Sequence, residues 1–142
     1  MEKERFEKDK EQNKFIESNK VHENYYGTHR DVVSSIVKSG KICILDIDIQ
    51  GVRMALSNGL TVANRMFILP PSLEVLKQRL EQRGTDSKKA IQKRLENAAK
   101  EIELAHSLDL FHVFIKNYKV EEFLIDCTTV IEEWYPHIKK HK

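Results

Sequence analysis

The sequence predicts an α/β fold built around a parallel sheet. Two uninterrupted apolar runs, residues 42–45 and 66–69, are typical of strands covered on both faces. The first run stops at Asp46 and the second at the prolines Pro70-Pro71. Residues 50–58, which lie between the two runs, have helical character. A helix between two strands is the usual connection between parallel strands of one sheet.

The first forty residues predict helices and a turn. Residues 5–14 are mostly charged, with Phe6 as their only aromatic residue, so we expect a solvated helix that contributes little core. Residues 24–28 predict a turn, in which Gly27 allows a positive φ and Thr28 caps the next helix. That helix would end at Gly40, and its apolar face is Val32, Val33, Ile36 and Val37.

The second half of the chain continues the alternation. Ser72 is expected to cap a helix that ends near Gly84, and a longer helix follows it. Residues 111–115 form a third strand candidate, and helical spacing resumes from Val120 to Trp134. The sequence shows no internal repeat or flexible linker, and sheets of this class bind ligands at the carboxyl ends of their strands.

Composition narrows the functional classes. The 142 residues are 40% hydrophobic and 32% charged, which suits a single folded domain. A net charge of +2 does not indicate nucleic-acid binding, and no apolar run is long enough to span a membrane. Cys43 and Cys127 form no C-x-x-C pair, and the opening residues mix acids with bases, unlike a secretory signal. We therefore expect a cytoplasmic protein.

Asp46 and Asp48 follow the first predicted strand. One carboxylate could organise a hydrated Mg²⁺ while the other, two residues on, accepts hydrogen bonds from a ligand. The alternative is a strand that simply ends at a polar loop. A calcium loop is excluded because Ser57 stands where its bidentate glutamate should be.

Three arginines flank residues 84–86. Arg79 and Arg83 precede this segment and Arg94 follows it, so a hinge there could close guanidinium groups over a polyphosphate. The alternative is that these arginines are solvated on helix surfaces.

Glu17 and Tyr26 suggest nucleotide recognition. An ionised carboxylate accepts two donors at once, which matches the N1–H and 2-amino edge of guanine, and the Tyr26 hydroxyl could reach a phosphate. The alternative is an ordinary turn with a surface glutamate. The histidines form no metal-binding pair, and the phosphate-binding motif G-x-x-x-x-G-K-[ST] is absent.

Several of these segments together resemble guanylate kinase. The resemblance extends from about Phe6 to the last helix. It rests on residues 15–17 (FIE), 24–28 (NYYGT), 40–52 (GKICILDIDIQGV), 67–72 (FILPPS) and 79–87 (RLEQRGTDS), in this order.

This resemblance implies a nucleoside monophosphate kinase fold, of the P-loop NTPase type, that transfers a phosphoryl group from ATP to GMP with Mg²⁺. Residues 1–40 would then form the GMP-binding part, 41–80 and 108–142 the core, and 81–107 the lid and its following helix. The implied GMP-binding residues are Glu17, Tyr26, Thr28 and Asp48. Asp46 is the residue implied to bind Mg²⁺ through water. Arg83 and Arg94 are implied to act in catalysis and to bind ATP, and Asn117 is implied to bind ATP beside the adenine.

One departure from the family is prominent. Guanylate kinases begin with a central strand and a glycine-rich phosphate loop, and neither is present in this sequence. We therefore expect an N-terminally truncated domain that is inactive alone and that self-associates through unpaired strands. The alternative is a catalytically dead guanylate kinase-like module for protein interaction.

Overall fold

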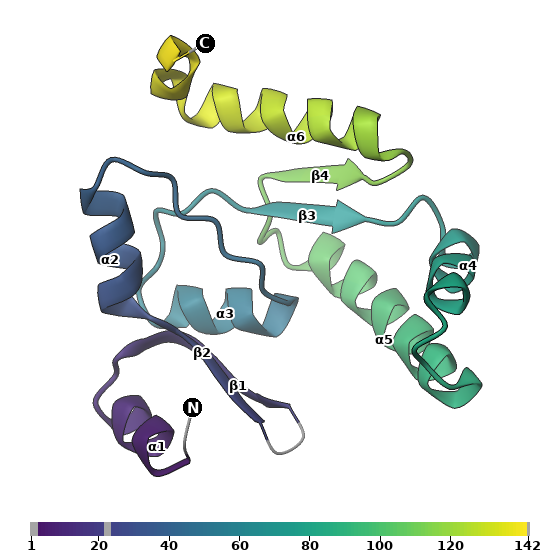
Figure 1. Cartoon of the computed structure of the whole chain (residues 1–142), viewed down its shortest axis with the longest axis horizontal. Helices are drawn as coiled ribbons and strands as arrows, with labels where there is room; N and C mark the ends of the chain where they lie inside the picture. Colours follow the sequence, from purple (N-terminus) through teal and green to yellow (C-terminus); the bar gives the residue numbers. More distant parts are fainter. Residues whose placement is uncertain (1–2, 22–23, 142) are drawn as a thin grey trace. The chain divides into compact units, whose positions relative to one another are not determined.

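The computed structural model describes residues 3–21 and 24–141, and it divides the chain into two compact units. Unit 1 comprises residues 1–63 and unit 2 comprises residues 64–142. Figure 1 shows the helices and strands of each unit. Unit 1 contains α1 (Lys3–Glu11), β1 (Phe15–Val21), β2 (Asn24–His29), α2 (Arg30–Lys38) and α3 (Ile49–Ser57). Unit 2 contains β3 (Met66–Leu69), α4 (Leu73–Arg83), α5 (Lys88–Ser107), β4 (Val113–Lys116), α6 (Val120–Trp134) and the short 3₁₀ helix η1 (Pro136–His141).

The N-terminal helix α1 is charged and largely exposed, as expected, and it supplies one residue, Phe6, to the core of unit 1. Phe6 on α1 is only 3% exposed, and its ring lies 5.1 Å from that of Phe15 and 4.9 Å from that of Tyr25. Asp9, also buried, accepts a hydrogen bond of 2.8 Å from Lys14 Nζ. One aromatic side chain and one ion pair therefore fix a helix that is otherwise charged and exposed.

The segment expected to form a turn is strand β2, which pairs with β1 in an antiparallel hairpin. Gly27 is not among the glycines with positive φ, and a Cβ built there would lie 2.9 Å from the Phe15 ring. Gly27 is thus required by close packing rather than by backbone conformation. The cap prediction was also wrong, because α2 begins after His29 and the Thr28 hydroxyl donates to Glu17 instead.

The predicted strand at residues 42–45 was wrong. Residues 41–48 are neither helix nor strand, and Ile44 is 75% exposed. A strand exists only where its backbone groups find a hydrogen-bonded neighbour. In the described part of the chain the only strand pairs are β1 with β2 and β3 with β4, so this apolar run has no sheet to join.

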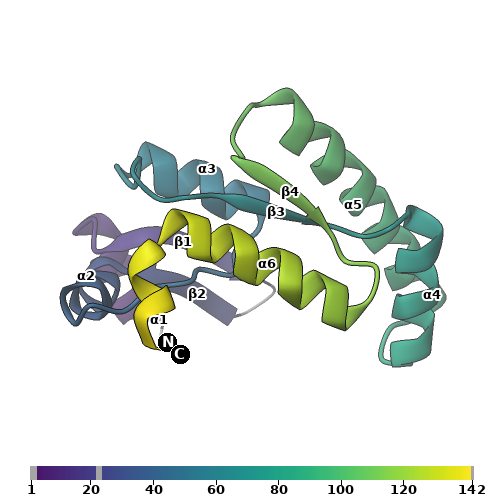
Figure 2. The same ribbon diagram turned by 90° about the horizontal axis from the view of Figure 1, so that it is seen from above.

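The α/β prediction is confirmed in unit 2, where β3 and β4 pair in parallel from Met66 opposite Val113 to Leu69 opposite Lys116. Helices α5 and α6 lie on opposite sides of this pair, as the two views together show (Figures 1 and 2). His106 of α5 stacks on Phe114 at 4.3 Å, whereas Cys127 of α6 contacts Met66. The third strand candidate, residues 111–115, begins two residues later and ends one residue later than predicted, as β4 (Val113–Lys116).

Helix α4 begins and ends where the sequence predicts, and the longer helix expected after it is α5. Ser72 caps α4 by accepting from Val75 N–H, and Ser87 caps α5 by accepting from Ala90 N–H. Gly84 ends α4 with a left-handed φ of 65°. Leu80 on α4 and Ile91 on α5 are buried, and the two helices pack on each other. No helix within the described ranges is both long and apolar enough to cross a membrane.

Candidate functional site

A buried carboxylate and a hydroxyl face each other on the hairpin of unit 1. Glu17 is 9% exposed, and its Oε1 accepts a 2.5 Å hydrogen bond from Thr28 Oγ1. The two residues are register partners, so they lie on the same face of the hairpin. Tyr26, two residues before Thr28 on β2, shares that face and is 56% exposed. The structure therefore brings Glu17, Tyr26 and Thr28 together.

A β-bulge gives Glu17 this orientation. The register runs from Phe15 opposite His29 to Glu17 opposite Thr28, so Ile16 is an extra residue in β1. Neighbouring residues of a strand point to opposite faces. Because of the bulge, Phe15 and Glu17 lie on opposite faces of the hairpin. Phe15 lies on the aromatic face with His29, and Glu17 lies on the face that carries Thr28.

Met54 on α3 and Asn58, the C-cap residue of that helix, contact β1 on both sides of Glu17. Asn58 Nδ2 donates a 2.9 Å hydrogen bond to the Ile16 carbonyl, and the Ser18 N–H donates to Met54 Sδ at 3.2 Å. No motif or spacing in the sequence signals these contacts, since Asn58 and Met54 lie about forty residues away along the chain. Neither Asn58 nor Met54 was predicted to contact this segment.

The two predicted acidic residues lie near the start of α3. Asp48 is its N-cap, and its Oδ1 accepts from Gly51 N–H at 2.7 Å, which leaves Oδ2 available. Asp46 is exposed in the irregular segment before it, not at the end of a strand. Among the residues with described placement, no three His, Cys, Asp or Glu side chains form a group that could hold a metal ion. A single carboxylate suits a hydrated Mg²⁺ shared with substrate phosphates, because Mg²⁺ keeps several of its waters.

The remaining candidates belong to unit 2. Arg83 is the exposed last residue of α4, and Arg94 lies exposed on α5, where its Nε is 3.2 Å from Asp86 Oδ2. Arg79 instead donates to the Tyr118 carbonyl at 2.8 Å, so it ties α4 to the segment after β4. Asn117 directly follows β4, and its N–H donates to the Leu69 carbonyl. The two arginines, which lie on either side of Gly84 along the chain, are thus solvent-accessible.

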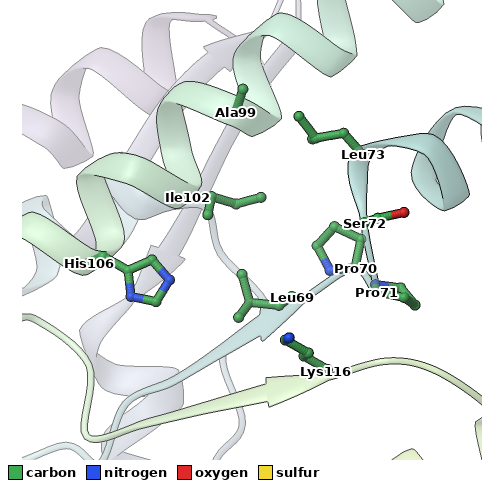
Figure 3. Close-up of a pocket in the computed structure, with 9 residues that line it drawn as sticks. All are labelled: Leu69, Pro70, Pro71, Ser72, Leu73, Ala99, Ile102, His106 and Lys116. Carbon is green, nitrogen blue, oxygen red and sulfur yellow. The ribbon is translucent and has the colours of Figure 1, made fainter.

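A cavity of about 350 Å³ opens at the carboxyl ends of β3 and β4 (Figure 3). Apolar side chains from β3, the loop after it and α5 form most of its wall. It contains none of the sequence-predicted site residues. Its lining is Leu69, Pro70, Pro71, Ser72, Leu73, Ala99, Ile102, His106 and Lys116.

Two groups outside these candidates have shifted pKa values. The hydrogen bond from Lys14 lowers the pKa of Asp9 below its usual 3.8. Burial, with a smaller contribution from Asp126, raises the pKa of the Cys127 thiol above its usual 9.0.

Comparisons with known proteins agree with one another. The family model described as guanylate kinase matches residues 1–134. Guanylate kinase 1 of rice is 42% identical over 84% of this chain and 31% of that protein. Guanylate kinase of Rickettsia bellii is 41% identical over 89% of this chain and 64% of that protein.

A solved structure supports the same assignment. The crystal structure of guanylate kinase from Anaplasma phagocytophilum matches with a TM-score of 0.69 and 26% identity, covering 94% of this chain and 62% of that one. The chain therefore spans less than two thirds of the length of these relatives. The family model, the curated relatives and the solved structure together show that this chain belongs to the guanylate kinase family.

Proposed function

We propose that this chain carries the guanine-recognising part and the lid arginines of an enzyme that transfers the γ-phosphoryl group of ATP to GMP. In this reaction the bond from the γ-phosphorus to the bridging oxygen of ADP breaks, and a bond to an oxygen of the GMP phosphate forms. The observation that carries the proposal is the Glu17 carboxylate, buried on the hairpin and oriented by the Thr28 hydroxyl.

The chemistry of Glu17 suits guanine. Thr28 uses its hydroxyl hydrogen on Oε1, so Oε2 and a second lone pair of Oε1 are left for further donors. Guanine offers N1–H and its 2-amino group on one edge, whereas adenine has an unprotonated N1 there. Asp48 would add a second acceptor, and the exposed Tyr26 hydroxyl would contact the GMP phosphate.

The charged residues suit the phosphates. Arg83 and Arg94 would neutralise charge that spreads over the transferred group, as guanidinium groups do in phosphoryl transfer. Asp46 would orient water on the Mg²⁺ that accompanies ATP, and Asn117 would lie beside the adenine. Mg²⁺ supplies charge neutralisation between the β- and γ-phosphates when it is bound.

Isothermal titration calorimetry tests guanine recognition without requiring turnover. The full chain should bind GMP more tightly than AMP, and Glu17→Gln should reduce that preference because a carboxamide accepts through one oxygen only. Glu11→Gln, at an exposed position on α1, is the matched control and should leave the preference unchanged. Equal binding of GMP and AMP by the wild-type chain would refute guanine recognition. Absence of binding by either nucleotide would favour an interaction module.

Two further parts of the proposal concern the 142-residue chain itself. The sequence contains no G-x-x-x-x-G-K-[ST] motif, so we expect negligible turnover of ATP and GMP by this chain alone. In the described residues β3 and β4 are each paired on one side only, which supports a tendency to self-associate. A coupled ADP-release assay and light scattering measure the two properties, and turnover at an ordinary kinase rate or a strictly monomeric chain would contradict them.

A further inference from the structure

Asn58, the C-cap residue of α3, donates a hydrogen bond to the backbone carbonyl of Ile16, the extra residue of the β1 bulge. Ile16 has no register partner on β2, and it is only 3% exposed, so water cannot readily satisfy its backbone. Asn58 Nδ2 lies 2.9 Å from the Ile16 oxygen. The bulge is therefore supported by a side chain that comes from a different element.

The bulge decides which face carries Glu17. Glu17 follows Phe15 by two positions. In a regular strand side chains alternate between the two faces, so without the bulge Glu17 and Phe15 would lie on the same face. Phe15 packs against Phe6 and His29 on that face. A carboxylate placed there would be buried among aromatic rings instead of facing Thr28. A change of one residue in register reverses the face of every later side chain.

Asn58 is itself held in place. Arg30 donates from NH2 to the Asn58 carbonyl at 2.8 Å and from Nε to the Asn13 carbonyl at 2.8 Å. At the other end of the same helix, Asp48 caps α3 through Gly51 N–H. The N-cap of α3 is thus Asp48, a proposed guanine contact. Its C-cap is Asn58, which supports the bulge next to Glu17, the other proposed guanine contact.

We infer that Asn58 is a positioning residue that determines guanine specificity by holding the β1 bulge and thereby the orientation of Glu17. The part of this inference that concerns guanine specificity rests on the proposed function. The mechanical part, that Asn58 keeps Glu17 facing Thr28, concerns the free protein and is testable without any nucleotide.

The first experiment measures discrimination between GMP and inosine monophosphate, which lacks the 2-amino group. The full chain and its Asn58→Leu variant, similar in size but without a donor, are titrated with both nucleotides. We expect the preference for GMP to fall about tenfold in the variant, the typical effect of losing one charge-assisted hydrogen bond. The control is Asp9→Asn, which perturbs unit 1 away from residues 16–18 of β1. It should weaken the binding of both nucleotides equally or leave both unchanged.

The outcomes separate the two proposals. No preference for GMP over inosine monophosphate in the wild-type chain refutes recognition of the 2-amino group, which the proposed function requires. A wild-type preference that Asn58→Leu leaves intact, or that falls only in step with overall affinity, overturns the positioning role. Arg30→Lys keeps the charge but loses the fork that joins Asn13 and Asn58. Arg30→Lys should also reduce the preference for GMP. This variant provides the test if Asn58→Leu does not fold.

The second experiment is a double-mutant cycle on stability. Thr28→Val removes the hydroxyl that faces Glu17, so it should destabilise the wild-type chain more than the Asn58→Leu chain, in which Glu17 no longer faces Thr28. Additive effects of the two substitutions would overturn the mechanical part of the inference whatever the nucleotide data show.

Discussion

Thr28→Val tests the central interaction of unit 1 directly. Valine has nearly the shape of threonine, so the substitution removes the hydrogen bond to Glu17 without leaving a large space. Glu17 is 9% exposed, and water can replace the lost donor only in part. A hydrogen bond to a charged group contributes about 1.5 to 3 kcal/mol, and we therefore expect unit 1 to lose about 2 kcal/mol.

The assay is urea unfolding followed by far-UV circular dichroism. Trp134 is the only tryptophan and belongs to unit 2, so its fluorescence reports that unit in the same titration. In a Glu17→Gln background the bond becomes neutral, and the cost of Thr28→Val should fall to about 1 kcal/mol. The difference between the two costs measures how much the charge contributes.

The control is Thr61→Val, at an exposed position of the same unit, which should change stability by less than about 0.5 kcal/mol. A Thr28→Val cost as small as that of the control would refute the reasoning. An equal cost in the wild-type and Glu17→Gln backgrounds would show that the hydroxyl does not act on the carboxylate.

Three further predictions concern other residues. Gly27→Ala would place Cβ 2.9 Å from the Phe15 ring, so it should cost about 1 to 3 kcal/mol in urea unfolding, and an unchanged midpoint would contradict this. Lys14 lowers the pKa of Asp9 below 3.8, so the bond stabilises the folded chain above that pH and is lost on further acidification. The stability difference between wild type and Asp9→Asn should therefore shrink as the pH falls below 3.8, and a constant difference would be inconsistent with the ion pair. Because burial raises the pKa of Cys127, its alkylation at neutral pH should be slower in the folded chain than in urea, and equal rates would show an accessible thiolate.

The sequence predicted elements whose signals are local. Ser72 starts a helix and Gly84 stops it through a bond and a backbone angle within a few residues, and the structure confirms both ends of α4. The apolar run at residues 66–69 was also assigned correctly, because a parallel partner exists in β4.

The errors share a different cause, which is dependence on distant partners. The run at residues 42–45 has the composition of a strand but no sheet neighbour in the described structure. Conversely, β1 carries polar residues in its second half, and no simple alternation distinguishes it from a loop. Its strand character comes from pairing with β2, and the bulge at Ile16 depends on Asn58.

The candidate site was predictable in its residue types but not in its support. Glu17 and Thr28 were placed in the same implied GMP-binding set, and the structure adds that they hydrogen-bond to each other. Asp48 was expected as a ligand contact after a strand, and it is found as a helix cap with one oxygen already engaged. Such bonds depend on side-chain orientation, which residue spacing does not encode.

The two ends of α3 make the length of this helix a constraint in its own right. One residue more or less would move Asn58 by about 1.5 Å along the helix axis and turn it by about 100° relative to Asp48. Asn58 would then no longer reach the Ile16 carbonyl while Asp48 still capped the helix. Gln50 and Arg53 lie on the exposed part of α3, and their side chains hydrogen-bond to each other at 3.4 Å instead of contacting β1. Insertions and deletions within α3 should therefore be far less tolerated than substitutions on its surface.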